Sequence, residues 1–269
     1  MLLIGRALMS VARYSIGGIM RNYITREDII KAFENNEFKV YIQPRYNIYT
    51  KEVIGGEALV RWFHGKKGML SSGLCIQVLE KLGLIEKLDL FIFEEVCKSL
   101  ASWEKQGLKR IPISVNLSQM TLKDMRNTMH LRDLLYRHEV PIELIELELT
   151  ETFMCMNNEG INKLREEGFK ILMDDFGKGY SSLASLKELP VDVIKIDRDF
   201  LIDIEKNEKA QAILKTIIDL MEIIKKEVVI EGIETKQQLE FIKSTKCKFA
   251  QGFLFNEAMS LEDFKQLIL

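Results

Sequence analysis

The sequence has few cysteines and histidines, and their positions exclude several kinds of site. Its four cysteines form no CxxC pair and stand at positions 75, 97, 155 and 247. Because no secretory signal is recognisable, we expect reduced thiols in a cytoplasmic protein rather than disulfides. The three histidines lack the spacing of a zinc site and stand at positions 64, 130 and 138. Any metal ion bound by this chain would therefore take oxygen ligands.

Long apolar runs and blocks of positive charge are also missing. Arg6 and Arg13 divide the apolar first twenty residues, so no run reaches the ~20 residues that a membrane span needs. We expect residues 1–24 to form a connector helix or the remnant of a longer protein. A helix lying on a membrane surface is the weaker alternative, because its polar face should carry more lysine and arginine. The net charge of −2 also argues against binding of polymeric nucleic acid.

The chain does contain a regular alternation of strand-like and helix-like segments. Thr25, followed by an acid at Asp28, predicts a helix start. Apolar residues three and four apart predict a helix over 205–226, with residues 210, 213, 214, 217, 218, 221 and 224 on one face. Strand-like apolar runs occupy residues 39–44, 52–63, 111–118, 142–151, 170–175, 191–197, 227–234 and 249–255.

This alternation predicts an α/β fold in which helices cover a parallel sheet. Eight strands suit a (β/α)8 barrel of the TIM type over residues 25–269. An open doubly wound sheet is the alternative, although no GxGxxG opens a helix after the first strand. Only NIYTKEV separates the first two runs, which is too short for a crossover connection. We therefore expect a hairpin there, and a barrel with one antiparallel strand.

Polar residues gather where these predicted strands end. The carboxyl ends of parallel barrel strands meet at one mouth, where barrel active sites lie. Any one of these acids could be a solvated loop charge or a helix cap, since acids are mostly exposed. The polar residues at the strand ends are Glu57, Asn116, Glu148, Glu151, Asp174, Asp175, Lys195, Asp197, Glu231, Glu234 and Gln251.

Taken as a set, the acids at these strand ends predict a metal site. Two carboxylates about 4 Å apart repel by roughly 4 kcal/mol at an effective dielectric of 20. Lys195 is the only cation at a nearby strand end, and one ammonium cannot neutralise five acids. Oxygen ligands of this kind suit Mg²⁺ or Mn²⁺. The predicted ligands are Glu57, Asn116, Glu148, Asp174, Asp175 and Glu231. Because strand neighbours point to opposite faces, Asp174 and Asp175 can both take part only where their strand ends and twists.

Eight short blocks then occur in an order that resembles a known family. They are QP at 43–44, GGEALVRW at 55–62, VNLS at 115–118, ELTE at 148–151, DDFGKGYSSL at 174–183, VIKIDRDF at 193–200, EGIET at 231–235 and QGFLF at 251–255. From about residue 25 to its end, the chain resembles the EAL-domain phosphodiesterases. That family hydrolyses the bacterial second messenger cyclic di-GMP to linear pGpG, on a barrel with one antiparallel strand.

The resemblance implies roles at the matching positions. Two Mg²⁺ or Mn²⁺ ions would bind: the first to Glu57, Asn116, Glu148 and Asp174, and the second to Asp174, Asp175 and Glu231. Four residues would serve catalysis: Glu231 as proton acceptor, Lys195 at the attacking water or the phosphate, Glu151 bracing the loop after Asp175, and Gln251 orienting water. Ligand contacts would come from Gln43, Arg61, Asp197 and Glu234. A homodimer is also implied.

Three departures from the family pattern support an alternative. The family usually has threonine at Lys178 and often has proline near Ser71 and at Ala258. These changes favour a catalytically weak cyclic di-GMP receptor or a protein-interaction module. The intact acids favour an active enzyme, because unpaired carboxylates gathered without purpose would cost stability.

Overall fold

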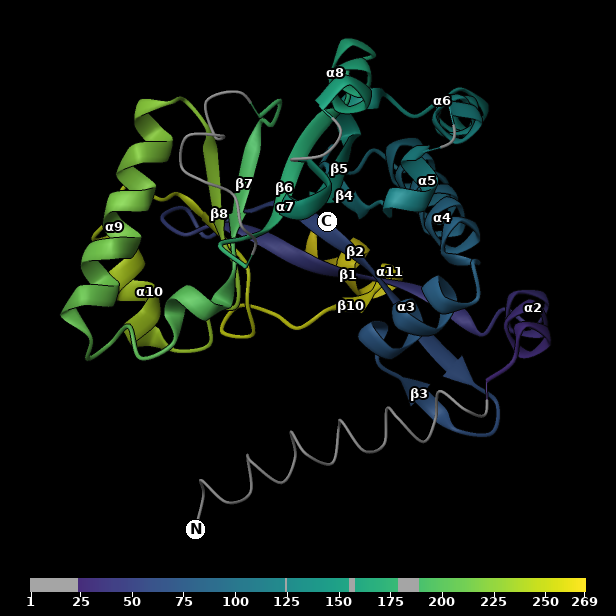
Figure 1. Cartoon of the computed structure of the whole chain (residues 1–269), viewed down its shortest axis with the longest axis horizontal. Coiled ribbons are helices and arrows are strands. Elements are labelled where there is room, and N and C mark those ends of the chain that lie inside the picture. The colour runs from purple at the N-terminus through teal and green to yellow at the C-terminus, as the bar shows by residue number, and fades with distance from the viewer. Residues whose placement is uncertain (1–23, 124, 155–157, 179–188) are drawn as a thin grey trace. The chain divides into compact units, whose positions relative to one another are not determined.

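A computed structural model describes residues 24–123, 125–154, 158–178 and 189–269 (Figure 1). The predicted connector therefore lies outside the described residues except for Ile24. The chain divides into two compact units. The described part of the N-terminal unit comprises residues 24–39 and 60–88, and the barrel unit comprises 40–59 and 89–269. Within the described ranges, none of the helices combines the length and apolar character that crossing a membrane requires.

The N-terminal unit begins with helix α2 (Arg26–Glu34), which starts as the sequence predicts. The Thr25 side chain accepts a hydrogen bond from Asp28 N, and the Asp28 carboxylate accepts one from Thr25 N. Helix α3 (Ser72–Lys81) is capped by Ser71, whose hydroxyl accepts a hydrogen bond from Leu74 N. A short strand that the sequence did not predict, β3 (Gly68–Leu70), pairs antiparallel with residues 62–64.

Eight strands form the closed barrel, and each falls on a predicted run. They are β1 (Phe38–Asn47), β2 (Val53–His64), β4 (Ile113–Asn116), β5 (Ile145–Thr150), β6 (Lys170–Phe176), β7 (Val193–Ile196), β8 (Glu227–Ile230) and β9 (Phe249–Ala250). Strand β2 and strands β4 to β9 pair in parallel in chain order. Strand β1 pairs antiparallel with β9 and also pairs with β2, which closes the ring. The predicted barrel with one reversed strand is confirmed, and the open-sheet alternative is wrong.

Helices alternate with the strands and cover the outside of the barrel. Figure 1 shows α9 and α10 on the outer side of β7 and β8. The remaining elements include the 3-10 turns η1 (Ile142–Leu144) and η3 (Arg198–Leu201) and strand β10 (Met259–Ser260), which pairs with β1. The helices are α4 (Ile85–Lys105), α5 (Gln119–Lys123), α6 (Met125–His138), α7 (Glu151–Met154), α8 (Asn158–Glu166), α9 (Glu208–Ile223), α10 (Lys236–Lys243) and α11 (Leu261–Leu267).

The apolar core is built from strand residues and from one stripe of each helix. Leu172, Val193 and Val229 pack together with no exposed surface. On α9, Leu214, Ile218 and Met221 are buried, but Ile213 keeps 55% of its surface exposed. The helix predicted over 205–226 is therefore present as α9, and burial covers only part of its predicted apolar face. The buried stripe is narrower than the apolar stripe, because only one side of α9 meets the sheet.

Candidate active site

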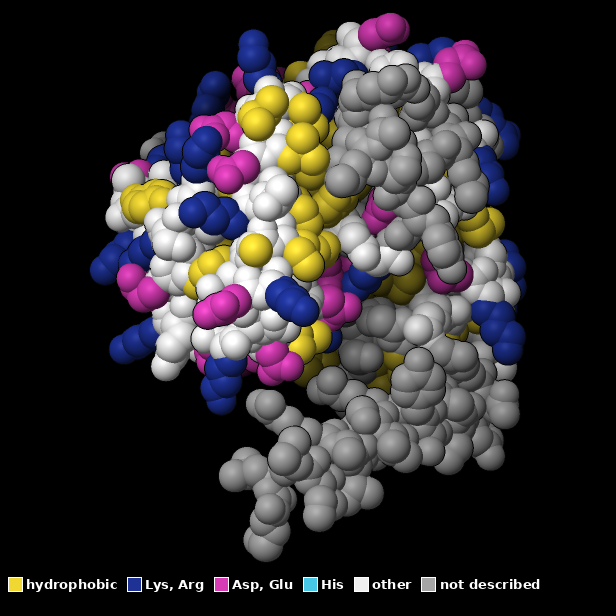
Figure 2. Space-filling model, turned by 60° about the vertical axis from the view of Figure 1, so that its left-hand side comes forward, with side chains coloured by type: hydrophobic (Ala, Val, Ile, Leu, Met, Phe, Trp, Pro, Cys, Tyr) yellow, Lys and Arg dark blue, Asp and Glu magenta, His cyan; other side chains and the backbone are white. Residues whose placement is uncertain are grey.

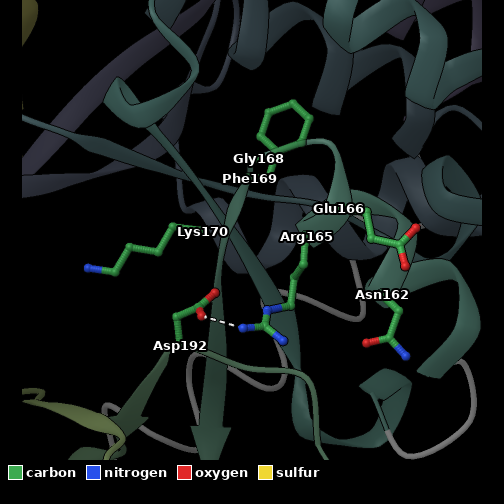
Figure 3. Close-up of a pocket in the computed structure, with 7 residues that line it drawn as sticks. All are labelled: Asn162, Arg165, Glu166, Gly168, Phe169, Lys170 and Asp192. Atoms are coloured by element: carbon green, nitrogen blue, oxygen red, sulfur yellow. Dashed lines mark hydrogen bonds and ion pairs between the residues drawn. The ribbon is translucent and has the colours of Figure 1, made fainter.

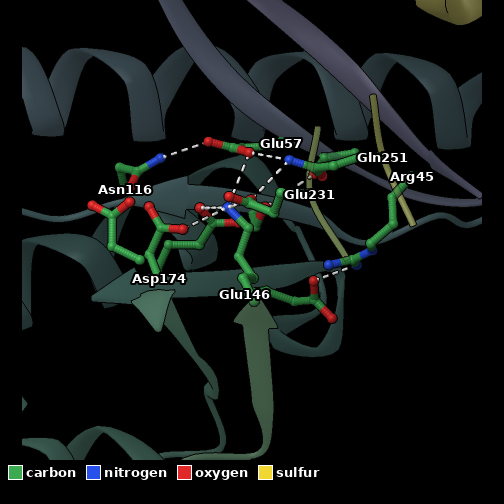
Figure 4. A network of polar contacts seen from close by, with 12 residues as sticks. Arg45, Glu57, Asn116, Glu146, Asp174, Glu231 and Gln251 are labelled. Carbon is green, nitrogen blue, oxygen red and sulfur yellow. Dashed lines mark hydrogen bonds and ion pairs between the residues drawn. The ribbon is translucent and has the colours of Figure 1, made fainter. Parts of the chain in front are cut away.

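The predicted strand-end acids converge on one ammonium in the barrel unit (Figure 4). Lys195 of β7 is 1% exposed, and its Nζ lies within ion-pair distance of four carboxylates, which we call the acid cluster. The distances from Nζ are 3.0 Å to Glu57 Oε2, 2.7 Å to Glu148 Oε2, 3.1 Å to Asp174 Oδ1 and 2.7 Å to Glu231 Oε1. Strands β2, β5, β6 and the end of β8 thus each contribute one acid to a single point.

Two amides fix the orientation of the cluster. Asn116, the last residue of β4, donates to Glu57 Oε1 at 3.2 Å. Gln251, directly after β9, donates to Glu57 Oε2 at 2.6 Å and to Glu231 Oε1 at 3.1 Å. Gln251 is itself buried and joins these two acids.

Burial and mutual repulsion divide the acids by their pKa. Burial alone would raise the pKa of Glu57, but the Lys195 charge and the hydrogen bonds from Gln251, Lys195 and Asn116 outweigh it, so this pKa is lowered. Burial and the Glu57 charge raise the pKa of Glu148 well above its ordinary value. Burial, with the charges of Asp174 and Glu57, raises the pKa of Glu231 to about 8. One ammonium therefore does not keep the whole cluster ionised at neutral pH.

The neighbours Asp174 and Asp175 lie where strand β6 is irregular at its end. The register with β7 shifts between Met173 and Phe176, and Asp175 has a positive φ of 58°. A bulge of this kind turns adjacent side chains away from strict alternation. Asp174 meets Lys195, and Asp175 Oδ1 lies 2.7 Å from Lys178 Nζ. The strand does end and twist here, as the sequence requires.

A second ion-pair group adjoins Asp175, and the sequence did not predict it. Lys178 Nζ also lies 2.6 Å from Asp197 Oδ2. The buried Asp197 caps η3 by accepting a hydrogen bond from Asp199 N at 2.8 Å. In the sequence, Lys178 stands out only as a lysine where the EAL-domain family usually has threonine. Its position three residues after Asp175 was the available signal for an ion pair.

The remaining predicted residues lie elsewhere or touch other groups. Glu151 is buried and accepts a hydrogen bond from Gly177 N at 3.1 Å, next to the Asp175 turn. Gln43 donates to Asn256 O at 3.4 Å. Glu234 is exposed and its side chain makes no described contact with the acid cluster. Arg61 belongs to the N-terminal unit, where it donates to Val60 O.

The donor set fits a divalent cation in its chemistry. The oxygens are carboxylate and amide oxygens, which Mg²⁺ and Mn²⁺ prefer. Glu148 Oε1 is buried with no hydrogen-bond partner among the described residues, so a ligand oxygen is left unsatisfied. Within the same residues, no three acids, histidines or cysteines are arranged so that they could hold an ion. The Lys195 ammonium lies among the acids instead.

One cavity of the barrel unit lies away from the acid cluster. It has a volume of about 620 Å³ and lies at the amino end of β6, whereas the acids lie at the carboxyl ends of their strands (Figure 3). Arg165 and Asp192 in its wall already form an ion pair at 2.9 Å. Its lining residues are Asn162, Arg165, Glu166, Gly168, Phe169, Lys170 and Asp192.

Comparison with known proteins identifies close relatives. The family profile described as the EAL domain matches residues 26–258. The cyclic di-GMP phosphodiesterase NbdA of Pseudomonas aeruginosa is 32% identical over 246 residues, which cover 90% of this chain and 31% of NbdA. The chain spans about a third of the length of the curated relatives it matches.

Two solved structures share the fold over most of the chain. The PaMucR phosphodiesterase in complex with c-di-GMP has a TM-score of 0.83 at 32% identity, covering 88% of this chain and 98% of that one. The EAL enzyme Bd1971, bound to cAMP and cyclic-di-GMP, has a TM-score of 0.86 at 30% identity, covering 100% of this chain and 75% of that one.

Proposed function

This chain belongs to the EAL domain family, and from that premise we propose that it hydrolyses cyclic di-GMP to linear pGpG with the help of divalent cations. The observation that carries the proposal is the convergence of four acids, Asn116 and Lys195 at the carboxyl ends of the barrel strands. The relative NbdA is a cyclic di-GMP phosphodiesterase by name, and the PaMucR structure is a phosphodiesterase in complex with c-di-GMP.

The proposed cations are two Mg²⁺ or Mn²⁺ ions, and the oxygen donors to hold them are present. When bound, such ions lower the pKa of a water molecule toward roughly 7 and stabilise charge on the phosphoryl oxygens. Burial, together with the charges of neighbouring acids, raises the pKa values of Glu148 and Glu231, and a bound divalent charge would favour the ionised form of both. The residues that would hold the ions are Glu57, Asn116, Glu148, Asp174, Asp175 and Glu231.

The chain's own side chains have separate tasks in the proposed reaction. Water attacks phosphorus in line with the leaving 3′ oxygen, so that a new P–O bond forms as the bond to the 3′ oxygen breaks, and the 3′ oxygen takes up a proton from solvent. Lys195 stabilises the negative charge that grows on the phosphoryl oxygens. Glu231, in its ionised form, accepts the proton from the attacking water. Gln251 holds Glu231 and Glu57 in fixed orientation and positions the water. Glu151 supports the turn at Gly177.

Ligand contacts and self-association complete the proposal. Gln43, Arg61, Asp197 and Glu234 would contact the bound dinucleotide. We also propose a homodimer formed through α9. Its Ile213 and Ile223 are 55% and 75% exposed. Figure 2 shows hydrophobic side chains interspersed with charged ones on the side of the molecule that it turns forward. Burying such side chains against a second copy would remove apolar surface from water.

A cyclic di-GMP receptor without turnover is the second candidate. The observation that favours it is the pairing of Lys178 with Asp175 and Asp197, because an ammonium on a ligand carboxylate opposes binding of a cation there. A barrel that binds the dinucleotide but holds its ions weakly would bind without cutting.

The first experiment is direct hydrolysis by the purified chain. With Mg²⁺ or Mn²⁺, we expect cyclic di-GMP to be converted to pGpG, measured by chromatography. Glu57→Ala should lower the rate at least about a hundredfold, because it removes a ligand and an anchor of the cluster. Glu159→Ala, on the exposed face of α8, is the control and should leave the rate unchanged.

The outcomes separate the candidates. Affinity for the dinucleotide without product would identify a receptor. Normal cleavage by Glu57→Ala would show that the cation ligands are wrongly assigned.

A further inference from the structure

Lys178 occupies a position in which it neutralises two acids at the edge of the proposed site. Its Nζ lies 2.7 Å from Asp175 Oδ1 and 2.6 Å from Asp197 Oδ2. The Asp197 side chain is only 6% exposed, whereas the side chains of Lys178 and Asp175 are 45% and 41% exposed. One partner is therefore fixed in the interior, and the lysine reaches it from a solvated turn.

The backbone of the turn directs the lysine back over Asp175. Lys178 N donates to Asp175 O at 3.1 Å, which closes a tight turn. Asp175 and Gly177 both have positive φ values, 58° and 98°. At Gly177 a Cβ would meet the Phe200 ring, so the chain passes close against η3, from whose start Asp197 projects. The contact between Lys178 and Asp197 follows from this local geometry.

The two ammonium groups of the site differ in character. Lys195 is buried among four acids and cannot leave without exposing them. Lys178 stands on the surface side and can swing into solvent, at the cost of two ion pairs. A divalent ion that takes Asp175 as a ligand must share this carboxylate with an ammonium or displace it.

We propose that Lys178 is a built-in counterion of Asp175 and Asp197 that weakens binding of one of the two divalent ions. This inference rests on the proposed function for the identity of the ligands. Its consequence is that the ions bind in two unequal steps. The ion held by Glu57, Asn116 and Glu148 enters first, and the ion that uses Asp175 enters only when Lys178 leaves. Turnover would then depend on the concentration of free cation through the second step.

The test counts bound ions rather than product. The full chain is titrated with Mn²⁺, and free Mn²⁺ is measured by its electron paramagnetic resonance signal. We expect two Mn²⁺ per chain, the second bound at least about tenfold more weakly than the first. Lys178→Met, and Lys178→Thr as a second variant, should tighten the second ion at least about tenfold and leave the first within about threefold.

Two controls test whether charge is the cause. Lys178→Arg keeps the charge and should behave as the unaltered chain. Lys163→Met removes a lysine of similar exposure, 49%, that pairs with Glu159 on α8, and it should change neither affinity. Equal second-ion affinities in the unaltered chain and both neutral variants would overturn the role of Lys178.

The same titration keeps the two proposals distinguishable. If the chain hydrolyses cyclic di-GMP but the neutral variants bind Mn²⁺ as the unaltered chain does, the Lys178 inference alone fails. If the neutral variants tighten the second ion but no protein cleaves the dinucleotide, hydrolysis fails and the counterion role stands. No bound Mn²⁺ in any protein would overturn both the proposed ligands and the inference.

Discussion

At the scale of single residues, the acid cluster contains four carboxyl groups around one ammonium group, that of Lys195. The pKa of Glu57 is lowered because the Lys195 charge and the hydrogen bonds from Lys195 and two amides outweigh the effect of burial. The pKa values of Asp174, Glu148 and Glu231 are raised. A cluster built in this way gains stability from any added positive charge, whether a proton or a divalent ion.

This charge state predicts how stability depends on pH when EDTA removes metal ions. The pKa of Glu231 is about 8 in the folded chain against an ordinary 4.5, so between these values the folded chain binds more protons than the unfolded chain. The free energy of unfolding should therefore fall as the pH rises from about 5 to about 8. Urea unfolding at both pH values measures the fall.

A neutral substitution supplies the control for this prediction. Glu231→Gln should reduce the fall, since it removes one group that must ionise on the way to pH 8. Glu240→Gln, at an exposed position on α10, should leave it unchanged. Stability that rises over this range, or an identical fall in Glu231→Gln, would contradict the assignment of the raised pKa.

Sequence reasoning located most of the cluster but not its internal contacts. The positions of Glu57, Glu148 and Asp174 at strand ends were sufficient to predict that they meet, because parallel strands deliver their carboxyl ends to one mouth. The contact of Lys178 with Asp197 was not predictable in the same way. It depends on the direction of one side chain after a bulge, and a one-residue change of register would reverse that direction.

At the scale of elements, the strand ends are held together by their following segments. Ile233 N, beyond β8, donates to Gln251 O at 3.2 Å, and Leu254 N donates to Ile233 O at 2.9 Å. Gly252 lies between these bonds, and a Cβ there would collide with the Ile233 backbone. The absence of a side chain at Gly252 thus allows the Gln251 segment to approach the end of β8.

Gly252→Ala should therefore destabilise the chain and displace Gln251. We expect a loss of roughly 1–3 kcal/mol in the free energy of unfolding, because backbone atoms cannot move aside as a flexible side chain can. Chemical denaturation measures the loss. Gly73→Ala is the matched control, since a Cβ there meets nothing within 4 Å and alanine favours the helix α3. Equal stability of Gly252→Ala and the unaltered chain would refute this account of the junction.

The strands that the sequence did not predict are short. Strands β3 and β10 have three and two residues, too few for an alternating pattern to be recognised. The long strands and α9 were found because their periodicity persists over many residues. The burial of the α9 face could not be predicted, since apolar periodicity does not distinguish a side chain buried in the chain's own core from one that remains exposed.

At the scale of the whole molecule, the exposed apolar residues of α9 predict the oligomeric state. Ile223→Glu places a charge on a side chain that is 75% exposed, which a monomer tolerates but a buried dimer contact does not. We expect a dimer mass for the unaltered chain and a monomer mass for Ile223→Glu by light scattering. Tyr136→Glu, at an 89% exposed position on α6, should keep the dimer. A monomeric unaltered chain would remove this part of the proposal.

The fold class was readable from the sequence because alternation of strands and helices has few compact solutions. The short connection between the first two strands also predicted the reversed strand. Side-chain contacts inside the site required the structure, since they depend on ångström-scale geometry that no periodicity records.

The seam of the barrel also has a consequence for how the protein is made. Tyr46 and Asn47 of β1 pair with Ala250 and Phe249, which come much later in the sequence. A ribosome produces β1 long before β9, so the nascent barrel keeps an unpaired edge until β9 has been made. Gln251, which orders the acids, follows β9 directly. Synthesis of β9 and Gln251 therefore both ends the period in which the exposed edge can aggregate and supplies the amide that completes the acid cluster.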